Sequence, residues 1–286
     1  MNNSAIELKN VVKTFDNFTL GPINIHIPKG VIVGFIGQNG AGKSTTIKLL
    51  LGLLHKDDGK IYLLGNQDYT NIAIKDKLGI VFDDLLMPEE MCLTDVEQFC
   101  SRVYTKWDTK SFHQFITKFN LPLKQRIKNY SRGMRMKLSM AIALSHNAEL
   151  LILDEATSGL DPIVRDEILD ILLEFMQDEN HSILVSSHIL SDLEKVADYI
   201  AFIHEGKILF FETKDELKEN YGICSLSTQE AELLDDKAII GKRTHAFGQD
   251  ILVKKSLVPN TIKLQKPSIE DIMVYFIKGE KKKCMH

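Results

Sequence analysis

Short apolar runs that end in polar or glycine-rich turns recur along the chain. Four of them are residues 31–36, 150–153, 183–185 and 199–203. Their apolar positions do not alternate with polar ones, which is typical of strands buried on both faces of a parallel sheet. Between them, residues such as 47–54 and 168–175 show the apolar spacing of helices. This alternation predicts an α/β fold in which helices cover a mainly parallel sheet.

One long stretch departs from the alternation. Residues 84–147 lack strand-like runs, and their apolar residues follow helical spacing at 96–104, 111–119 and 134–145. We therefore predict a mostly helical insertion in the α/β domain.

A second departure begins at Tyr221. Short alternating segments at 238–241, 250–254 and 261–264 precede a helical pattern at 269–277. Pro267 and Ser268 introduce that helix, as is common at helix starts. The pattern predicts a small β-rich C-terminal appendage. The expected organisation is an α/β domain over residues 4–219, with its helical subdomain at about 84–147, and an accessory subdomain over 220–280.

Composition narrows the classes of protein that fit. Hydrophobic residues make up 44% of the chain and charged residues 26%, which suits a packed globular core. The formal net charge of −4 argues against a nucleic-acid partner, because such partners require a markedly basic surface. No run approaches the roughly 18 apolar residues of a membrane span, and the first residues lack a signal-peptide pattern. We expect a cytoplasmic location.

Residues 37–45 read G-Q-N-G-A-G-K-S-T, between the apolar run at 31–36 and a helical pattern. This is the Gly-x-x-x-x-Gly-Lys-Ser pattern in its strand–loop–helix context, which a glycine-rich turn with a surface lysine does not explain. The glycines allow the backbone to fold around phosphate oxygens at a helix N-terminus. Lys43 is expected to reach the β- and γ-phosphates of a nucleotide, and the Ser44 hydroxyl to bind Mg²⁺. The predicted nucleotide contacts in this loop are Gly37, Gln38, Asn39, Gly40, Ala41, Gly42, Lys43, Ser44 and Thr45.

Two carboxylates follow the apolar run at 150–153. Asp154 and Glu155 are thereby placed at the carboxyl edge of a buried strand, where ligands of open α/β sheets bind. Asp154 is expected to hold Mg²⁺, usually through water, and Glu155 to act as general base on the attacking water. The alternative is an exposed acidic pair that caps the next helix.

With three further motifs, residues 4–215 resemble the ATP-binding cassette (ABC) family. The family order is G-Q-N-G-A-G-K-S-T at 37–45, Y-S-R-G-M at 130–134, L-L-I-L-D-E at 150–155, S-G-L-D at 158–161 and S-S-H at 186–188. The resemblance implies a P-loop NTPase cassette that binds and hydrolyses ATP with Mg²⁺.

The segment Y-S-R-G-M occupies the place of the family's signature loop. Ser131 is a good helix N-cap and Gly133 permits a close backbone approach, so a second helix N-terminus can face an anion. In the family, that anion is the γ-phosphate bound by the other protomer. The resemblance therefore implies a head-to-tail dimer with two ATP between the chains, and an interface that contains Ser131, Arg132, Gly133 and Asp161.

Three further residues take their roles from the resemblance. His188 would donate to the γ-phosphate and link nucleotide state to Glu155. Asp161 would cross the dimer interface, although a simple helix cap also explains it. Phe15 would stack on adenine, where the family more often has tyrosine, and Phe18 is the competing choice.

Three residues depart from the family pattern. Asp83 occupies the position of the family's glutamine that contacts Mg²⁺ and senses the membrane partner. An aspartate there is expected to bind Mg²⁺ or hold a water, although it is shorter than glutamine and charged. Arg132 replaces the second signature glycine, and Met134 replaces the usual glutamine. The signature changes and the terminal P-S-I-E-D-I-M-V-Y-F-I-K-G resemble exporter cassettes of the drug, bacitracin and lantibiotic resistance type.

The expected function is that of the ATPase subunit of an exporter. A second copy or a paralogous cassette would complete the dimer, and a separately encoded permease would dock near residues 83–105. The chain would then lie on the inner face of the cell membrane. The alternative is a cytosolic ABC-type ATPase that acts as a nucleotide switch without transport.

Overall fold

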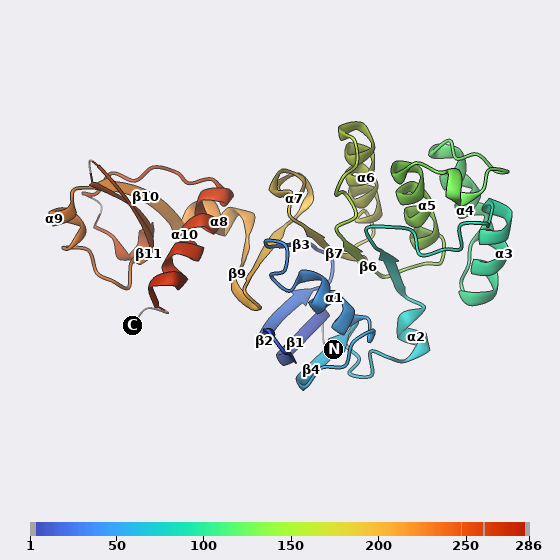
Figure 1. Ribbon diagram of the computed structural model, residues 1–286, viewed down its shortest axis with the longest axis horizontal. Helices are drawn as coiled ribbons and strands as arrows, with labels where there is room; N and C mark the ends of the chain where they lie inside the picture. Colours follow the sequence, from blue (N-terminus) through green and yellow to red (C-terminus); the bar gives the residue numbers. More distant parts are fainter. Residues whose placement is uncertain (1–3, 247, 260, 284–286) are drawn as a thin grey trace. The chain divides into compact units, whose positions relative to one another are not determined.

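The chain divides into two compact units. The computed structural model describes residues 4–246, 248–259 and 261–283. Unit 1 spans Met1–Ile208 and unit 2 spans Leu209–His286. Figure 1 colours them from blue through yellow and from orange to red. The division falls before the predicted boundary at residues 219 and 220, because strand β9 (Lys207–Thr213) carries the chain from one unit into the other.

A parallel sheet forms the centre of unit 1. Its strands lie in the order β5-β6-β7-β3-β8. Every residue of β3, β6 and β7 is buried, which is why their sequences are apolar without alternation. Strands β3, β6, β7 and β8 confirm the four predicted runs, whereas β5 was not among them. Their bounds are β3 (Ile32–Ile36), β5 (Leu78–Val81), β6 (Leu150–Asp154), β7 (Ser182–Ser187) and β8 (Tyr199–His204).

A second, antiparallel sheet in unit 1 has the order β2-β1-β4. The predicted apolar runs did not include these strands, because β2 alternates between buried and exposed positions and so reads as a half-buried strand. The hairpin pairs Phe15 with Phe18 at its turn. The strands are β1 (Ser4–Phe15), β2 (Phe18–Pro28) and β4 (Asp58–Leu63).

The helices of unit 1 follow the alternation that the sequence predicted. Helix α7 packs against β3 and β7, α1 against β6, and α6 against α7. Their bounds are α1 (Lys43–Leu50), α2 (Ile72–Lys75), α6 (Pro162–Phe175) and α7 (Leu190–Val196).

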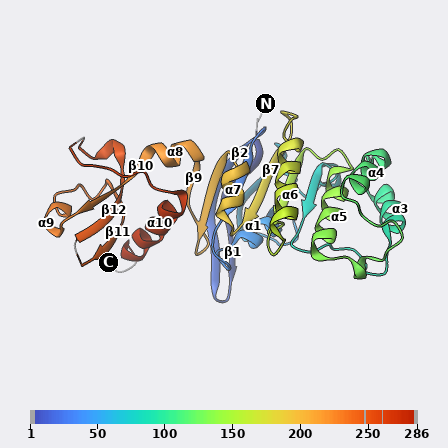
Figure 2. The same ribbon diagram turned by 90° about the horizontal axis from the view of Figure 1, so that it is seen from above.

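The predicted helical insertion is confirmed. Helices α3 (Leu93–Val103), α4 (Thr109–Lys118) and α5 (Arg132–Leu144) occupy it, with the short η1 (Ile127–Asn129) before α5. The two views in Figures 1 and 2 place α3, α4 and α5 together at one end of unit 1. Asp108 and Ser131 cap the N-termini of α4 and α5 with their side chains.

Unit 2 is built on a three-stranded antiparallel sheet with the order β10-β12-β11. Cys224, Ile251 and Val253 lie in its hydrophobic core. The prediction of a strand at 261–264 was wrong. That segment forms no strand, and the next residue, Gln265, makes only an isolated bridge with Ile223. The elements are α8 (Lys214–Asn220), β10 (Tyr221–Leu226), α9 (Thr228–Ala231), β11 (Ile239–His245), β12 (Gly248–Lys254), η2 (Lys255–Leu257) and α10 (Ile269–Lys283).

Candidate functional site

The glycine-rich loop between β3 and α1 owes its shape to two close contacts. A Cβ atom at Gly37 would lie 2.4 Å from the carbonyl oxygen of Ile203. Gly42 has a φ of 114°, and a Cβ there would lie 2.6 Å from the Leu20 side chain. Neither position accepts a larger residue without displacement of its neighbours. The loop therefore presents backbone N–H groups at the N-terminus of α1, with Ser44 and Thr45 in the first helical turn.

Lys43 is held in this loop by backbone oxygens and a carboxylate. Its Nζ donates to the carbonyl oxygens of Gly37 at 2.7 Å and Gln38 at 3.3 Å. The same Nζ lies 3.1 Å from Glu155 Oε1, in an ion pair whose lysine is only 5% exposed. A buried ammonium group requires such partners. The structure thus brings together the predicted lysine and the predicted general base.

The acidic pair lies where the sequence placed it, at the carboxyl end of β6. Asp154 is a register partner of Ser186 on β7, and Ser186 Oγ donates to Asp154 Oδ1 at 2.6 Å. The N–H of Glu155 lies 3.1 Å from Ser186 Oγ and 3.2 Å from the Ser186 carbonyl oxygen. Ser186 was given no role from sequence, and only the register of two strands distant in the chain identifies it.

His188 follows β7 and faces Glu155. Its Nδ1 lies 2.6 Å from Glu155 Oε2, and the imidazole is 44% exposed. Glu155 has a φ of 54°, in the left-handed region that costs energy for a residue with a Cβ. A strained backbone at this position aims one carboxylate at both Lys43 and His188. The carboxyl ends of β3, β6 and β7 therefore supply one cation, two carboxylates and an imidazole.

The residues predicted for Mg²⁺ divide into two groups. Ser44 and Asp154 offer the hard oxygen donors that Mg²⁺ prefers, and protein sites for this ion often rely on one carboxylate plus phosphate and water. Asp83 instead lines an open pocket of about 440 Å³ with Asp84, Tyr130, Arg132 and Arg135. Two of the three departures from the family pattern, Asp83 and Arg132, thus line one pocket. Among the described residues, no group of three or more His, Cys, Asp or Glu side chains is arranged so that it could hold a metal ion by itself.

The signature segment begins α5 as its sequence suggested. Ser131 Oγ accepts a hydrogen bond from the N–H of Met134 at 3.2 Å. A Cβ at Gly133 would make ordinary contact with Val164 at 3.4 Å, so within one chain the packing of α5 beside α6 does not require a glycine here. The Arg132 guanidinium lies over Gly159, where an added Cβ would be 3.0 Å from its Nη1. The signature loop therefore contacts the loop at 158–161 within one chain.

Asp161 caps the N-terminus of α6, which is the simpler of the two roles expected for it. Its Oδ1 accepts hydrogen bonds from the N–H groups of Ile163 and Val164, both at 3.1 Å. The side chain is exposed, so the cap leaves it at the surface of unit 1. Its proposed position at a dimer interface is compatible with this exposure.

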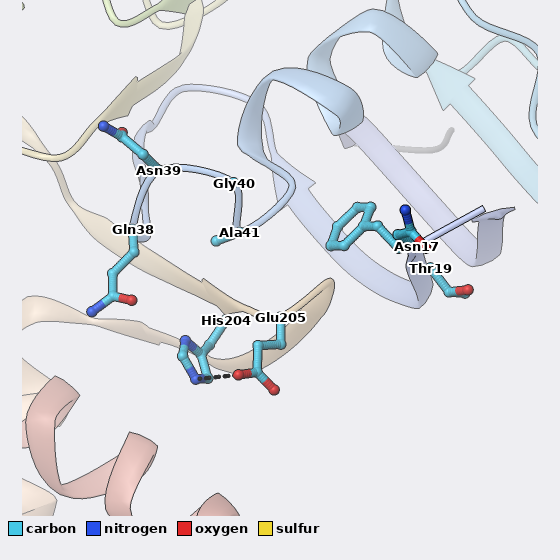
Figure 3. A pocket seen from close by; sticks show the side chains of 9 residues that line it. Asn17, Thr19, Gln38, Asn39, Gly40, Ala41, His204 and Glu205 are labelled. Atoms are coloured by element: carbon cyan, nitrogen blue, oxygen red, sulfur yellow. Dashed lines mark ion pairs between the residues drawn. The ribbon is translucent and has the colours of Figure 1, made fainter. Parts of the chain in front are cut away.

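An open pocket of about 430 Å³ lies beside the phosphate loop. Figure 3 shows Asn17, Thr19, His204 and Glu205 around the loop residues that line it. Phe18 belongs to this lining, whereas Phe15 does not. Phe15 is 40% exposed and stacks on Phe18 with 6.3 Å between ring centroids. Both candidates for adenine stacking are therefore neighbours on one hairpin, and the choice between them stays a prediction.

The architecture and the loop define the class first: this is a P-loop NTPase fold. A solved ATP-binding subunit of an ABC transporter has a TM-score of 0.68 and 25% sequence identity, over 75% of this chain and 92% of that one. The family model described as ABC transporter matches residues 20–158.

Curated relatives agree with the family model. A bacitracin transport ATP-binding protein of Enterococcus faecalis is 34% identical over 72% of this chain and 68% of its own length. A lantibiotic transport ATP-binding protein of Streptococcus pyogenes is 35% identical over 71% and 89%. An uncharacterised ABC transporter ATP-binding protein of Bacillus subtilis strain 168 is 32% identical over 96% and 92%.

The chain belongs to the family of ABC transporter ATP-binding proteins, and it is an ATP-binding and ATP-hydrolysing subunit. This outcome confirms the predicted class and favours the transporter subunit over the cytosolic switch. Across residues 4–246, 248–259 and 261–283, none of the helices combines the length and the apolar character of a bilayer span.

Proposed function

We propose that two copies of this chain bind two ATP head to tail and drive a separately encoded permease that exports its substrate. The observation that carries the proposal is the contact chain from Lys43 through Glu155 to His188 at the carboxyl ends of three adjacent strands. The relatives named as bacitracin and lantibiotic transport ATP-binding proteins support the transport role, and the resemblance to exporter cassettes supports the outward direction. The permease would select the substrate.

The residues of one chain would share the work on the nucleotide. The triphosphate competes with the Gly37 and Gln38 carbonyls for the Lys43 ammonium group, because all three groups offer oxygen acceptors. Release of Lys43 toward phosphate weakens its ion pair with Glu155. The freed Glu155 carboxylate then accepts a proton from the attacking water. His188 orients this carboxylate and donates a hydrogen bond toward the γ-phosphate.

Mg²⁺ would be held by the Ser44 hydroxyl and, through water, by Asp154, and it would neutralise charge on the β- and γ-phosphates. Ser186 supports this role because its hydroxyl fixes one Asp154 oxygen. Asp83 follows β5, whose register pairs Val81 with Leu153, so it would add a carboxylate at the same sheet edge as Asp154.

The dimer is proposed because the two helix N-termini that can face phosphate lie in different parts of unit 1. One begins α1 at the phosphate loop, and the other begins α5 in the helical insertion. Figures 1 and 2 show α5 with α3 and α4, and α1 among the strands. The exposed Ser131 and Arg132 at the start of α5 would face the γ-phosphate bound by the partner chain. Asp161 would lie at the same interface.

The helical insertion offers a surface for the permease. Its exposed apolar side chains include Leu86 at 74%, Phe99 at 47% and Val103 at 54% exposure. Phe99 and Val103 lie four residues apart on α3 and therefore share one face of that helix. Exposed apolar side chains that adjoin one another mark protein contacts. They fall inside the predicted docking region at 83–105, so the chain would work on the inner face of the cell membrane, held there by the permease.

The decisive experiment is the substitution Glu155→Gln. We expect ATP binding to persist, hydrolysis to fall by about 10²–10⁴-fold because the general base is lost, and an ATP-trapped dimer to accumulate. Titration with ATP, phosphate release and light scattering with ATP and Mg²⁺ measure the three effects.

Glu149→Gln is the matched control, because Glu149 precedes the same strand β6 at its opposite end and pairs with Lys77 at 2.7 Å. It should hydrolyse ATP like the unmodified protein. Undiminished hydrolysis by Glu155→Gln would refute the role of Glu155. A Glu155→Gln protein that binds ATP and stays monomeric would contradict the dimer.

A further inference from the structure

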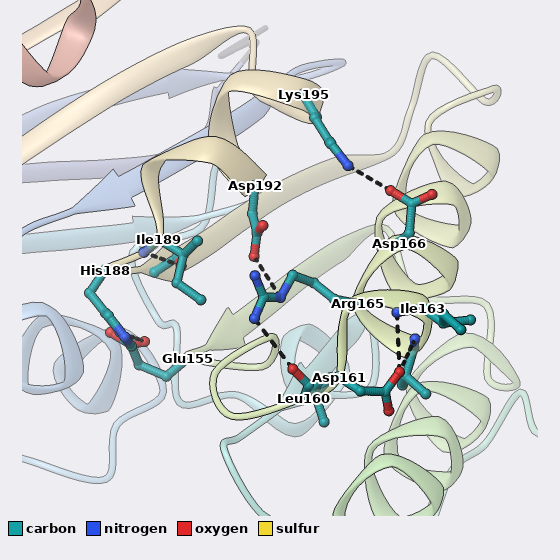
Figure 4. A network of polar contacts seen from close by, with 12 residues as sticks. Glu155, Leu160, Asp161, Ile163, Arg165, Asp166, His188, Ile189, Asp192 and Lys195 are labelled. Carbon is teal, nitrogen blue, oxygen red and sulfur yellow. Dashed lines mark hydrogen bonds and ion pairs between the residues drawn. The ribbon is translucent and has the colours of Figure 1, made fainter.

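Two segments leave the candidate site together and meet again at a distance from it. One runs from Glu155 through a turn, in which the N–H of Ser158 donates to the Glu155 carbonyl at 3.0 Å, into the loop at 158–161 and α6. The other runs from His188 into α7. Figure 4 shows that Arg165 of α6 reaches between them, toward Asp192 of α7 and toward Leu160.

Asp192 is a buried carboxylate that the hydrolytic machinery does not use. It is only 4% exposed, and its Oδ2 lies 3.7 Å from Arg165 Nε. Neither of these two atoms has a hydrogen-bond partner within the described part of the chain. A buried charge without compensation is costly, so the ion pair with Arg165, together with the positive charge of nearby Lys195, has to balance this one.

The same guanidinium also holds the loop that precedes α6. Arg165 Nη2 donates to the Leu160 carbonyl oxygen at 3.3 Å. The planar guanidinium presents several N–H groups in fixed directions, so it can serve a carboxylate and a carbonyl at once. A lysine has a single nitrogen and would favour one of the two. We call Arg165, Leu160 and Asp192 the Arg165 clamp.

The clamp closes a ring of contacts. At one end of the two segments, Glu155 and His188 are 2.6 Å apart, and at the other end Arg165 joins Leu160 to Asp192. A displacement of α7 therefore shifts both His188 and, through Arg165, the loop that carries Asp161. Such a ring constrains the separation of Glu155 and His188 more than their single contact does.

We propose that Arg165 is a positioning residue for ATP hydrolysis, which keeps Glu155 aligned with His188 and couples α7 to the loop at 158–161. The part that concerns the dimer rests on the proposed function, because there the loop presents Asp161 to the partner chain. The part that concerns alignment within one chain rests on ATP hydrolysis alone.

The test replaces the charged pair by apolar side chains in Arg165→Met/Asp192→Leu. Removal of both charges avoids a stranded buried carboxylate, so the double variant is expected to fold. Because small misalignment at a reacting centre is costly, kcat should fall by about tenfold or more while the KM for ATP changes by less than about twofold. Thermal unfolding checks the fold, and steady-state kinetics separate kcat from KM.

The control removes a second ion pair between the same two helices. Lys195 of α7 and Asp166 of α6 are 2.7 Å apart, and both side chains are largely exposed. Lys195 also acts on Asp192 through its charge, whereas Arg165 is the residue that bonds the Leu160 carbonyl oxygen. Asp166→Asn/Lys195→Met should keep wild-type kcat. A fall in kcat equal to that of the clamp variant would reduce the effect to general helix packing and overturn the proposal.

A conservative variant keeps the test decisive if the double variant does not fold. Arg165→Lys retains a cation for Asp192 but cannot also hold Leu160, so kcat should fall less than in a folded clamp variant but still measurably. Wild-type kcat in either folded variant would overturn the proposal.

The dimer part is measured in the Glu155→Gln background, where the clamp variant should need more ATP to form the trapped dimer. If Glu155→Gln alone forms no dimer, the proposed function fails, while the kcat comparison still decides the role of Arg165. If it dimerises and the clamp variant requires no additional ATP, the coupling to the interface loop is refuted.

Discussion

The two compact units both combine helices with a sheet, but their strands run in different ways. In unit 1 the strands β5, β6, β7, β3 and β8 are parallel, so their carboxyl ends meet at one edge. In unit 2 the strands β10, β12 and β11 are antiparallel, so successive carboxyl ends point in opposite directions. A parallel sheet gathers the residues that follow its strands in one place, and an antiparallel sheet disperses them.

The polar groups of the two units reflect this difference. In unit 1, Lys43, Glu155 and His188 follow different strands and still contact one another. In unit 2, Ser225 bonds Asp250 across neighbouring strands at 2.6 Å. Burial raises the pKa of the Cys224 thiol, which keeps it protonated and unreactive. In unit 2, Ser225, Asp250 and Cys224 stabilise the packing of the sheet. In unit 1, Lys43, Glu155 and His188 form a candidate binding site for phosphate.

The largest expected effect comes from a substitution in the phosphate loop of unit 1, which should reduce ATP binding and hydrolysis. Lys43→Ala removes the only side chain of the phosphate loop that carries a positive charge. We expect weaker ATP binding and a fall in turnover of roughly 10²–10³-fold, as for other lost electrostatic contacts to a transition state. Equilibrium titration and phosphate release measure both.

Lys48→Ala is its control, because Lys48 lies on the same helix α1 at an exposed position. It should bind and hydrolyse ATP normally. Wild-type turnover in Lys43→Ala would mean that the phosphate loop is not the site of hydrolysis.

The next effect concerns unit 2 alone. A Cβ at Gly241 would lie 2.0 Å from the Tyr275 carbonyl oxygen, so Gly241→Ala forces β11 and α10 apart. Overpacking of this kind costs about 1–3 kcal/mol, or more where the backbone must move. We expect a lower unfolding temperature or faster proteolysis within residues 209–286, with ATP hydrolysis retained.

Leu233→Ala controls for substitution in unit 2, because Leu233 is 86% exposed. Its unfolding should match that of the unmodified protein. If Gly241→Ala abolished hydrolysis in a protein whose unit 1 stays folded, the functional separation between the two units would be refuted.

The smallest effect is a pH dependence inside the helical part of unit 1. His146 is fully buried and stacks on Tyr104 with 3.9 Å between ring centroids. Burial lowers the pKa of His146 below its ordinary value of 6.5, so the unfolded chain binds this proton more readily than the folded one. Stability is therefore lost as the pH falls below that value, by at most about 1.4 kcal/mol per pH unit.

His146→Phe keeps a stacked ring without a titrating group, so denaturant unfolding should depend less on pH between neutral and acid conditions. His113→Gln removes an exposed histidine of the same helical part and should leave the dependence unchanged. An unaltered pH dependence in His146→Phe would show that another group senses acid.

The sequence predicted four of the five parallel strands, all except β5, and predicted the antiparallel ones less completely. Runs such as 150–153 are apolar throughout because β6 is buried on both faces, so their identity does not depend on a partner. Strand β10 was not predicted, although the region after Tyr221 was expected to be β-rich. The segment 261–264 alternates like a strand but forms none, and only the adjacent Gln265 makes an isolated bridge with Ile223. Half-buried segments depend on a partner that local pattern does not identify.

The sequence by itself determined the phosphate loop, the acidic end of β6 and the family, because each depends on neighbouring residues in a fixed order. Only the tertiary structure decided that Ser186 holds Asp154, that Lys43 pairs with Glu155 and that Arg165 joins Leu160 to Asp192. These contacts join residues on different strands and helices. Sheet register and helix packing bring them together, and both arise from burial of the whole core rather than from any local pattern.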